Sequence, residues 1–155
     1  MGSVEITAPR SEPAHRGSRR RSREIALQAL YQWLLSGDEA DVICRQAAEQ
    51  KDYARADADY FEFLTHAVIG RSEELRAALQ PFLDRPAQQL SPIEHALLLL
   101  GACELMYAPE VPYRVAINEA VELAKTYGGT DGHKYVNGVL DKLAAQVRRP
   151  ETRKA

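Results

Sequence analysis

Arginine is concentrated near the start of the chain, where four of five consecutive residues carry a guanidinium group. The run reads Arg19-Arg20-Arg21-Ser22-Arg23. A guanidinium stays protonated at physiological pH, and its planar N–H groups bind two oxygens at once, so arginine suits phosphate. Cations at a helix N-terminus oppose the macrodipole by about 0.3–1 kcal/mol each, which favours a functional reason for keeping them. The run predicts contact with a nucleic-acid backbone, against the alternative of a solvated, solubilising tail.

A second group of candidate binding residues stands more than a hundred positions later. Lys134 lies between His133 and Tyr135 just after a glycine pair, and Tyr127 precedes that pair. A lysine beside aromatic rings offers one phosphate contact and ring faces for unstacked bases, worth roughly 1–3 kcal/mol per base. The alternative is that both tyrosines are ordinary core aromatics. Binding by both groups requires the arginines and the Lys134–Tyr135 corner to line one continuous groove.

Sequence patterns for catalysis and metal binding are absent. The chain has no nucleophile elbow, phosphate-binding glycine loop, dinucleotide fingerprint or zinc-protease motif. Cys44 and Cys103 are interpreted as small core hydrophobes, because two cysteines alone make neither a disulfide framework nor a zinc site. The four histidines show no ligand spacing with either cysteine; they are His15, His66, His95 and His133. We therefore expect no enzyme activity, no cofactor and no metal.

The composition is that of a soluble chain of one domain. Its 155 residues are 45% hydrophobic and 27% charged, with a formal net charge of −2, which excludes collagen-like and wholly disordered proteins. Residues 1–23 hold six arginines against two glutamates, a charge of +4, so the remainder carries −6. No apolar stretch is long enough to span a bilayer, and none near the start is typical of a secretion signal. We expect a cytoplasmic protein with no membrane partner.

Apolar residues recur at helical spacing through most of the chain, and no alternating pattern indicates a sheet. Ser91-Pro92-Ile93-Glu94 predicts a helix start in which the glutamate reaches back to the backbone N–H of the cap. His95 beside it is expected to be partly exposed, and Gly128-Gly129 fits a left-handed helix end. Helices are expected over 18–37, 39–49, 57–82, 91–107, 112–127 and 131–147, the last capped by Asp131. The sequence predicts an all-α compact bundle of six or seven helices.

Three parts are expected along the chain. Residues 1–17 contain prolines, glycine and small polar residues, and they bury too little surface to offset the entropy of ordering, so a flexible arm is expected. Residues 18–148 form the helical domain, and 149–155 form a basic tail.

Three stretches carry a family resemblance. They are Arg19-Arg20-Arg21-x-Arg23-Glu24 followed by Ala29-Leu30-Tyr31-x-Trp33, then Val111-Pro112-Tyr113-x-Val115-Ala116-Ile117-Asn118-Glu119-Ala120-Val121-Glu122-Leu123-Ala124-Lys125, and last Lys134-Tyr135-Val136-Asn137-Gly138-Val139-Leu140-Asp141-Lys142. In this order they resemble the NusB family of bacterial transcription antitermination factors, over roughly residues 19–147. The resemblance implies an all-helical fold of two small helical subdomains.

The resemblance also implies a function. Members of this family bind the boxA element of leader and ribosomal RNA transcripts together with NusE, a small-subunit ribosomal protein. Within an antitermination complex they help RNA polymerase to read through terminators. By position, the residues implied to contact RNA are Arg19, Arg20, Arg21, Arg23, Tyr31, Lys134 and Tyr135, with Asp131 beside them. Phe82, Glu94 and His95 fall near the family's NusE interface.

Two other classes of function stay open. One is a stand-alone helical RNA-binding module related to the domain that RNA methyltransferases carry, although the chain lacks a glycine-rich cofactor motif for methyl transfer itself. The other is a protein–protein scaffold without RNA binding, whose arginines only aid solubility. Crosslinks from RNA to Tyr135 or to the arginine run would separate these classes.

Overall fold

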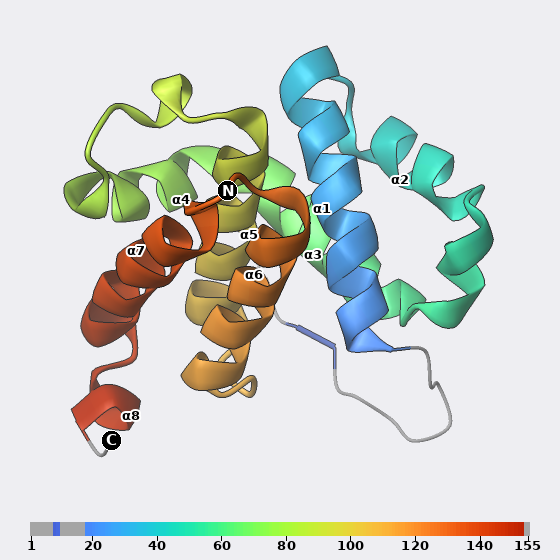
Figure 1. Cartoon of the computed structure of the whole chain (residues 1–155). Coiled ribbons are helices and arrows are strands. Elements are labelled where there is room, and N and C mark those ends of the chain that lie inside the picture. Colours follow the sequence, from blue (N-terminus) through green and yellow to red (C-terminus); the bar gives the residue numbers. More distant parts are fainter. Residues whose placement is uncertain (1–7, 10–17, 154–155) are drawn as a thin grey trace, which may run out of the picture.

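The protein is all-α over the residues that the structure describes, which are 8–9 and 18–153. In this computed structural model, shown in Figure 1, that part of the chain contains eight α-helices, three short 3-10 segments and no strand. One isolated parallel bridge joins Ser18 to Ala56. The all-α fold predicted from the helical spacing is confirmed. The arm expected at residues 1–17 lies outside the described residues, apart from Ala8 and Pro9.

The helices form two groups that share one central helix (Figure 1). The first group holds α1 (Arg19–Ser36), α2 (Ala40–Ala48) and α3 (Ala58–Gly70), and the second holds α4 (Ser72–Leu79), α6 (Tyr113–Tyr127), α7 (Gly132–Val147) and α8 (Arg149–Arg153). Between them lies α5 (Pro92–Tyr107), and the 3-10 segments cover Lys51–Arg55, Gln80–Phe82 and Ala87–Gln89. No described helix combines the length and the apolar character that crossing a membrane requires. The arrangement agrees with the two subdomains that the resemblance implies.

The helix predicted over 57–82 is in fact two helices, α3 and α4. With this division and the additional helix α8, the six predicted helices become eight in the described residues. α3 ends at Gly70, and Arg71, with φ −117° and ψ 21°, leaves the helical conformation before α4 begins. Val68 before the break and Leu75 after it are both buried. Because apolar residues face the core on both sides of the break, their spacing alone could not mark it.

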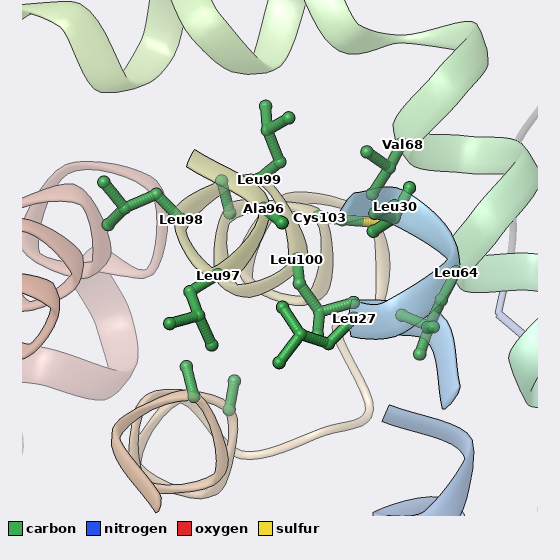
Figure 2. Close-up of a cluster of buried hydrophobic side chains, with 14 of the residues drawn as sticks. Leu27, Leu30, Leu64, Val68, Ala96, Leu97, Leu98, Leu99, Leu100 and Cys103 are labelled. Atoms are coloured by element: carbon green, nitrogen blue, oxygen red, sulfur yellow. The ribbon is translucent and has the colours of Figure 1, made fainter. Parts of the chain in front are cut away.

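The central helix α5 is buried on nearly all sides. Every residue from His95 to Leu105 is buried, and Figure 2 shows Leu97, Leu98, Leu99 and Leu100 pointing toward different neighbours. Burying one leucine side chain stabilises the fold by about 1.5–3 kcal/mol. The labelled side chains around them are Leu27 and Leu30 of α1 and Leu64 and Val68 of α3. α5 is therefore the frame on which both groups of helices are placed.

Helix ends follow local sequence signals, with two differences. Ser91 accepts a hydrogen bond from the backbone N–H of Glu94, but the Glu94 carboxylate accepts from the Ser91 hydroxyl and not from the backbone N–H of the cap. Gly37 ends α1 in the left-handed conformation, at φ 71°. Gly128 ends α6 in an extended conformation, at φ −86° and ψ 176°, so the left-handed geometry predicted there is wrong. Glycine is needed at 128 for close approach, because a Cβ atom would lie 2.7 Å from the Ala124 carbonyl oxygen.

The residue that follows α7 is tied to the end of α5. Arg148 is buried, and its guanidinium donates to the backbone carbonyls of Glu104, Leu105 and Ala108 at 2.8–3.1 Å. At a helix C-terminus intrahelical donors run out, and the macrodipole favours a positive charge there. One arginine thus completes the hydrogen bonding of the central helix and fixes the end of α7 against it.

Candidate nucleic-acid interface

The arginine run forms the first turn of α1, and two of its side chains lie at the surface. Ser18 caps the helix by accepting a hydrogen bond from the backbone N–H of Arg21 at 3.1 Å. The Arg20 side chain is 74% exposed and pairs with Glu119 at 3.3 Å. The Arg21 side chain is 35% exposed and pairs with Glu24 at 2.7 Å. These two guanidiniums are the members of the run that solvent reaches most easily.

Arg19 is held against the bundle. Its guanidinium carbon lies 4.0 Å from the centroid of the Tyr60 ring, and one N–H donates to the Pro9 carbonyl at 2.7 Å. A cation over a tyrosine face is attracted by the ring quadrupole, by about 0.5–1 kcal/mol or more when water is excluded. Arg19 therefore lies at the edge of the surface that Arg20 and Arg21 form.

Arg23 is buried, although it belongs to the run for which RNA contact is expected. Its Nε and Nη2 atoms donate to the two carboxylate oxygens of Glu104 at 2.7 and 2.8 Å, and the Tyr60 hydroxyl donates to the same carboxylate. Burial opposes the charge on Arg23, but the hydrogen bonds and negative charge of Glu104 outweigh it and raise the pKa of the guanidinium. Burial and Glu104 also raise the pKa of Tyr60, so its hydroxyl keeps the proton it donates. Arg23 therefore positions the start of α1, and its contact with RNA stays a prediction.

The sequence contained a signal for the burial of Arg23. This residue is in helical register with Ala26, Leu27 and Leu30, all of which are buried. Its partner Glu104 stands inside the apolar sequence of α5. The pairing itself is not local, because 81 positions separate the two residues.

A hollow of about 370 Å³ lies between α1 and α6. Arg20 lines it together with carboxylates from both helices, Glu24, Glu119 and Glu122, so the charges in it are mixed. Lys134 and Tyr135 are not among its lining residues. This hollow is therefore not the single groove expected to join the arginines to the Lys134–Tyr135 corner.

The α6–α7 turn is nevertheless brought against α1 by Tyr127. The Tyr127 hydroxyl donates to Glu24 Oε2 at 3.0 Å, while Oε1 of the same carboxylate accepts from Arg21. Burial and the carboxylate of Glu24 raise the pKa of Tyr127. Tyr31 follows Glu24 by seven residues and so lies on the same side of α1. Tyr31 and Tyr127 are each 37% exposed, so two accessible rings line this side of the helix.

Lys134 and Asp131 pair with each other at the start of α7. The Lys134 Nζ atom lies 3.4 Å from Asp131 Oδ1, and both side chains are about three-quarters exposed. The Asp131 side chain makes no capping hydrogen bond, so the capping role predicted for it is wrong. An exposed pair of this kind contributes about 0–1 kcal/mol. The lysine can therefore exchange its carboxylate partner for a phosphate at little cost.

Tyr135 faces a different neighbour. Its hydroxyl donates to Asp84 Oδ1 at 2.9 Å and accepts from the backbone N–H of Asp84 at 3.2 Å, and the Arg85 guanidinium carbon lies 5.7 Å from its ring centroid. Hydrogen bonds from Arg85 and Tyr135 hold the pKa of Asp84 at about 2. The Asp84 carboxylate is the main cause of the raised pKa of Arg85, and the negative charge of Glu94 raises it further. The structure thus joins Tyr135 to the loop between α4 and α5 and not to the arginine run. The sequence analysis did not predict a role for this loop, where the one signal is the charged pair Asp84-Arg85 before Pro86.

Phe82, Glu94 and His95 all lie where α4 is followed by α5. Phe82 and Glu94 are half-buried. His95 is buried, which corrects the expectation of partial exposure, and its Nε2 atom accepts a hydrogen bond from Arg76 Nε at 3.0 Å. Burial and the charge of Arg76 lower the pKa of His95 to about 4. Of the three, only Phe82 and Glu94 offer surface to a partner.

Acidification is expected to destabilise the protein through His95. The unfolded chain takes up this proton near pH 6.5 and the folded chain only near pH 4, so the free energy of unfolding falls as the pH drops through that window. One such group contributes up to about 1.4 kcal/mol per pH unit. Urea unfolding at several pH values across the window measures the effect. His95→Gln, which keeps an acceptor for Arg76, is expected to flatten the dependence, and equal slopes for the two proteins would contradict the assignment.

Sequence comparison relates nearly all of the helical region to one family. The NusB family model matches residues 20–145. The transcription antitermination protein NusB of Nitrosomonas eutropha is 53% identical over 150 residues, covering 94% of this chain and 90% of that protein. The protein of the same name from Paraburkholderia xenovorans is 56% identical over 140 residues, covering 90% of this chain and 97% of that protein.

Solved structures of the same family have a similar fold. NusB from T. maritima has a TM-score of 0.79 at 24% identity, over 89% of this chain and 99% of that chain, which shows the fold alone. A crystal structure of antitermination factors NusB and NusE in complex with dsRNA has a TM-score of 0.73 at 25% identity. That similarity covers 83% of this chain and 96% of the other.

Proposed function

The chain belongs to the NusB family of transcription antitermination factors, and we propose that it binds the boxA element of leader and ribosomal RNA transcripts together with NusE. Bound there, it joins the antitermination complex through which RNA polymerase reads past terminators. The observation that carries the proposal is the match over residues 20–145, with relatives of the same name more than half identical. The similar structure that holds NusB, NusE and dsRNA supports joint binding. In this proposal the protein is a cytoplasmic adaptor that catalyses no reaction.

The RNA surface in this proposal follows α1 toward the start of α7. Arg20 and Arg21 supply two guanidiniums at one end, Tyr31 supplies an accessible ring, and Lys134 supplies a cation beyond the α6–α7 turn. The hydrogen bond from Tyr127 to Glu24 supports the continuity of this surface, because it holds the turn against α1. The two proposed contacts at its margins are Arg19, at the start of α1, and Asp131, which orients Lys134.

Exchange of carboxylate partners for phosphates makes this surface suited to RNA. When a phosphate takes Arg21, Glu24 still accepts a hydrogen bond from Tyr127. When a phosphate takes Arg20, Glu119 still has Arg23, whose Nη1 atom lies 3.5 Å from Glu119 Oε1. A partly enclosed carboxylate left without any partner costs about 1–3 kcal/mol or more. The second partners avoid that cost, and the arginines become available.

The NusE surface in this proposal lies at the start of α5 and the loop before it. Phe82 and Glu94 are the half-buried contacts, and His95 lies buried beside Glu94, where it accepts a hydrogen bond from Arg76. Tyr135 lies at the boundary between the two surfaces, because it is on α7 next to Lys134 yet bonds to Asp84. We propose that its ring contacts RNA at this boundary.

NusE is expected to raise the affinity of the chain for boxA RNA by at least about tenfold. Two proteins that contact each other and one strand raise the effective concentration of each binding site. Fluorescence anisotropy of a labelled boxA strand, with and without saturating NusE, measures the effect, and a scrambled strand is the control. Phe82→Ala is expected to abolish the gain while leaving binding of RNA by the chain alone unchanged. If NusE leaves the affinity unchanged, the coupling is wrong, and if neither strand binds in either condition, the chain is a scaffold without RNA.

A further inference from the structure

Three side chains with metal-binding atoms come together where α2 packs on α3. Cys44 of α2 and Glu62 and His66 of α3 place a sulfur, a carboxylate oxygen and an imidazole nitrogen within 4.8 Å of one another. Glu62 and His66 are four residues apart and so share one side of α3. Their Oε2 and Nε2 atoms are 3.1 Å apart. Cys44 lies opposite, 5% exposed.

Asp41 adds a fourth donor to this cluster. It precedes Cys44 by three residues on α2, and its Oδ1 atom lies 3.8 Å from His66 Nε2. Asp41, Cys44 and Glu62 together line a hollow of about 500 Å³. Three of the four donors, together with Arg45, therefore border open space that an ion can enter from solvent, and the His66 nitrogen lies next to two of them.

We propose that Asp41, Cys44, Glu62 and His66 bind a Zn²⁺ ion between α2 and α3. Zn²⁺ takes four ligands of these three chemical types at about 2.0–2.3 Å, which sets neighbouring ligand atoms roughly 3.3–3.8 Å apart in a tetrahedron. The separations of 3.1 and 3.8 Å at His66 are already close to those values. Side-chain rotation supplies the rest, because Glu62 and His66 are nearly half exposed.

The mixture of donors selects this class of metal. A thiolate and an imidazole suit zinc and other late transition ions, whereas Mg²⁺ and Ca²⁺ prefer oxygen alone. Without a metal, burial and the carboxylate of Glu62 raise the pKa of the Cys44 thiol to about 12, so it stays protonated. Binding forms a metal–sulfur bond as the S–H bond breaks, and the proton passes to solvent.

An ion at this position would attach α2 to the rest of the bundle. The buried residues of α2 are only Ile43, Cys44 and Ala47. Two ligands from α2 and two from α3 connect the helices through bonds that exist only in the folded chain, so binding raises stability. No metal motif is visible in the sequence because the ligands come from two helices separated by the 3-10 segment Lys51–Arg55.

Titration with Co²⁺ tests the site in the whole protein purified without a histidine tag. Co²⁺ accepts the same ligands, and a thiolate-to-cobalt absorption band appears only when a cysteine sulfur is bound. We expect a band that saturates at one ion per chain, is displaced by Zn²⁺ and is absent in Cys44→Ser. Cys103→Ala, which alters the other buried cysteine, is the matched control and is expected to keep the band.

Variants of the remaining ligands separate binding from folding. His66→Gln, Glu62→Gln and Asp41→Asn change exposed or half-exposed side chains, so they are expected to fold normally and to bind Co²⁺ more than about tenfold more weakly. Zn²⁺ is expected to raise the melting temperature of the unaltered protein but not that of His66→Gln, with His133→Gln as control. No band at millimolar Co²⁺, or equal affinity in His66→Gln, would overturn the proposal.

Discussion

Glu104→Ala is expected to lower the free energy of unfolding by about 3–5 kcal/mol, because it leaves a buried guanidinium without its counter-charge. The Arg23 side chain is 6% exposed and donates two hydrogen bonds to Glu104. The Tyr60 hydroxyl loses its acceptor in the same variant. Urea unfolding followed by circular dichroism measures the loss. The variant is also expected to loosen the first turn of α1, where Arg20 and Arg21 stand.

Glu122→Ala is the matched control for this loss. Glu122 is half exposed, and among the described residues its carboxylate pairs with Lys125 on its own helix, at 3.3 Å. Its removal is expected to change stability by less than about 0.5 kcal/mol. The double variant Arg23→Met with Glu104→Met removes both charges. Because apolar replacement of both partners is often neutral or stabilising, its free energy of unfolding separates the cost of one unpaired charge from the net contribution of the ion pair. Equal losses in Glu104→Ala and Glu122→Ala would show that the buried pair does not hold α1.

Arg20→Ala with Arg21→Ala is expected to weaken binding of boxA and scrambled RNA alike, on the order of tenfold at low salt. If about four phosphates are neutralised, the slope of log affinity against log salt is about −3 for a single strand. Removing two of the cations is expected to make that slope shallower by about 1.4. Anisotropy titrations at several salt concentrations measure both quantities.

Arg45→Ala with Arg114→Ala removes the same charge from exposed positions on α2 and α6 and is expected to leave RNA binding nearly unchanged. Folding is not at risk in the test variant, because both side chains reach solvent and cations at this end of α1 oppose the macrodipole. A salt slope that does not change in the Arg20 and Arg21 variant would remove these two residues from the RNA surface.

The helices were largely predictable because residues close to their ends determine where they begin and stop. Ser18 and Ser91 cap α1 and α5, because the hydroxyl of each accepts a hydrogen bond from the backbone N–H three residues later. Gly37 takes the one left-handed conformation among the described residues. Each of these signals acts within one turn of the chain. The break at Arg71 has a weaker signal, Gly70, because apolar spacing continues across it.

The candidate site was less predictable because its electrostatics depend on partners far apart in the chain. Arg23 and Arg20 stand in the same run, yet Arg23 pairs with a buried carboxylate of α5, whereas Arg20 stays exposed beside Glu119 of α6. His95 is buried where α4 supplies Arg76 as a hydrogen-bond donor. Composition and resemblance point to particular segments, but burial decides which side chains in them face solvent.

The hydrogen bonds from Arg148 to the end of α5 have a consequence for synthesis on the ribosome. The chain emerges from its N-terminal end, so the hydrogen bonds from the Arg148 guanidinium to the end of α5 form only after α7 has left the exit tunnel. Until then the side of the central helix that faces α7 is uncovered, including Gly101 opposite Leu140. A product of interrupted translation that ends before α7 would carry the arginine run but leave this apolar side exposed. Chaperones or proteases would then bind the exposed side before the product could bind RNA.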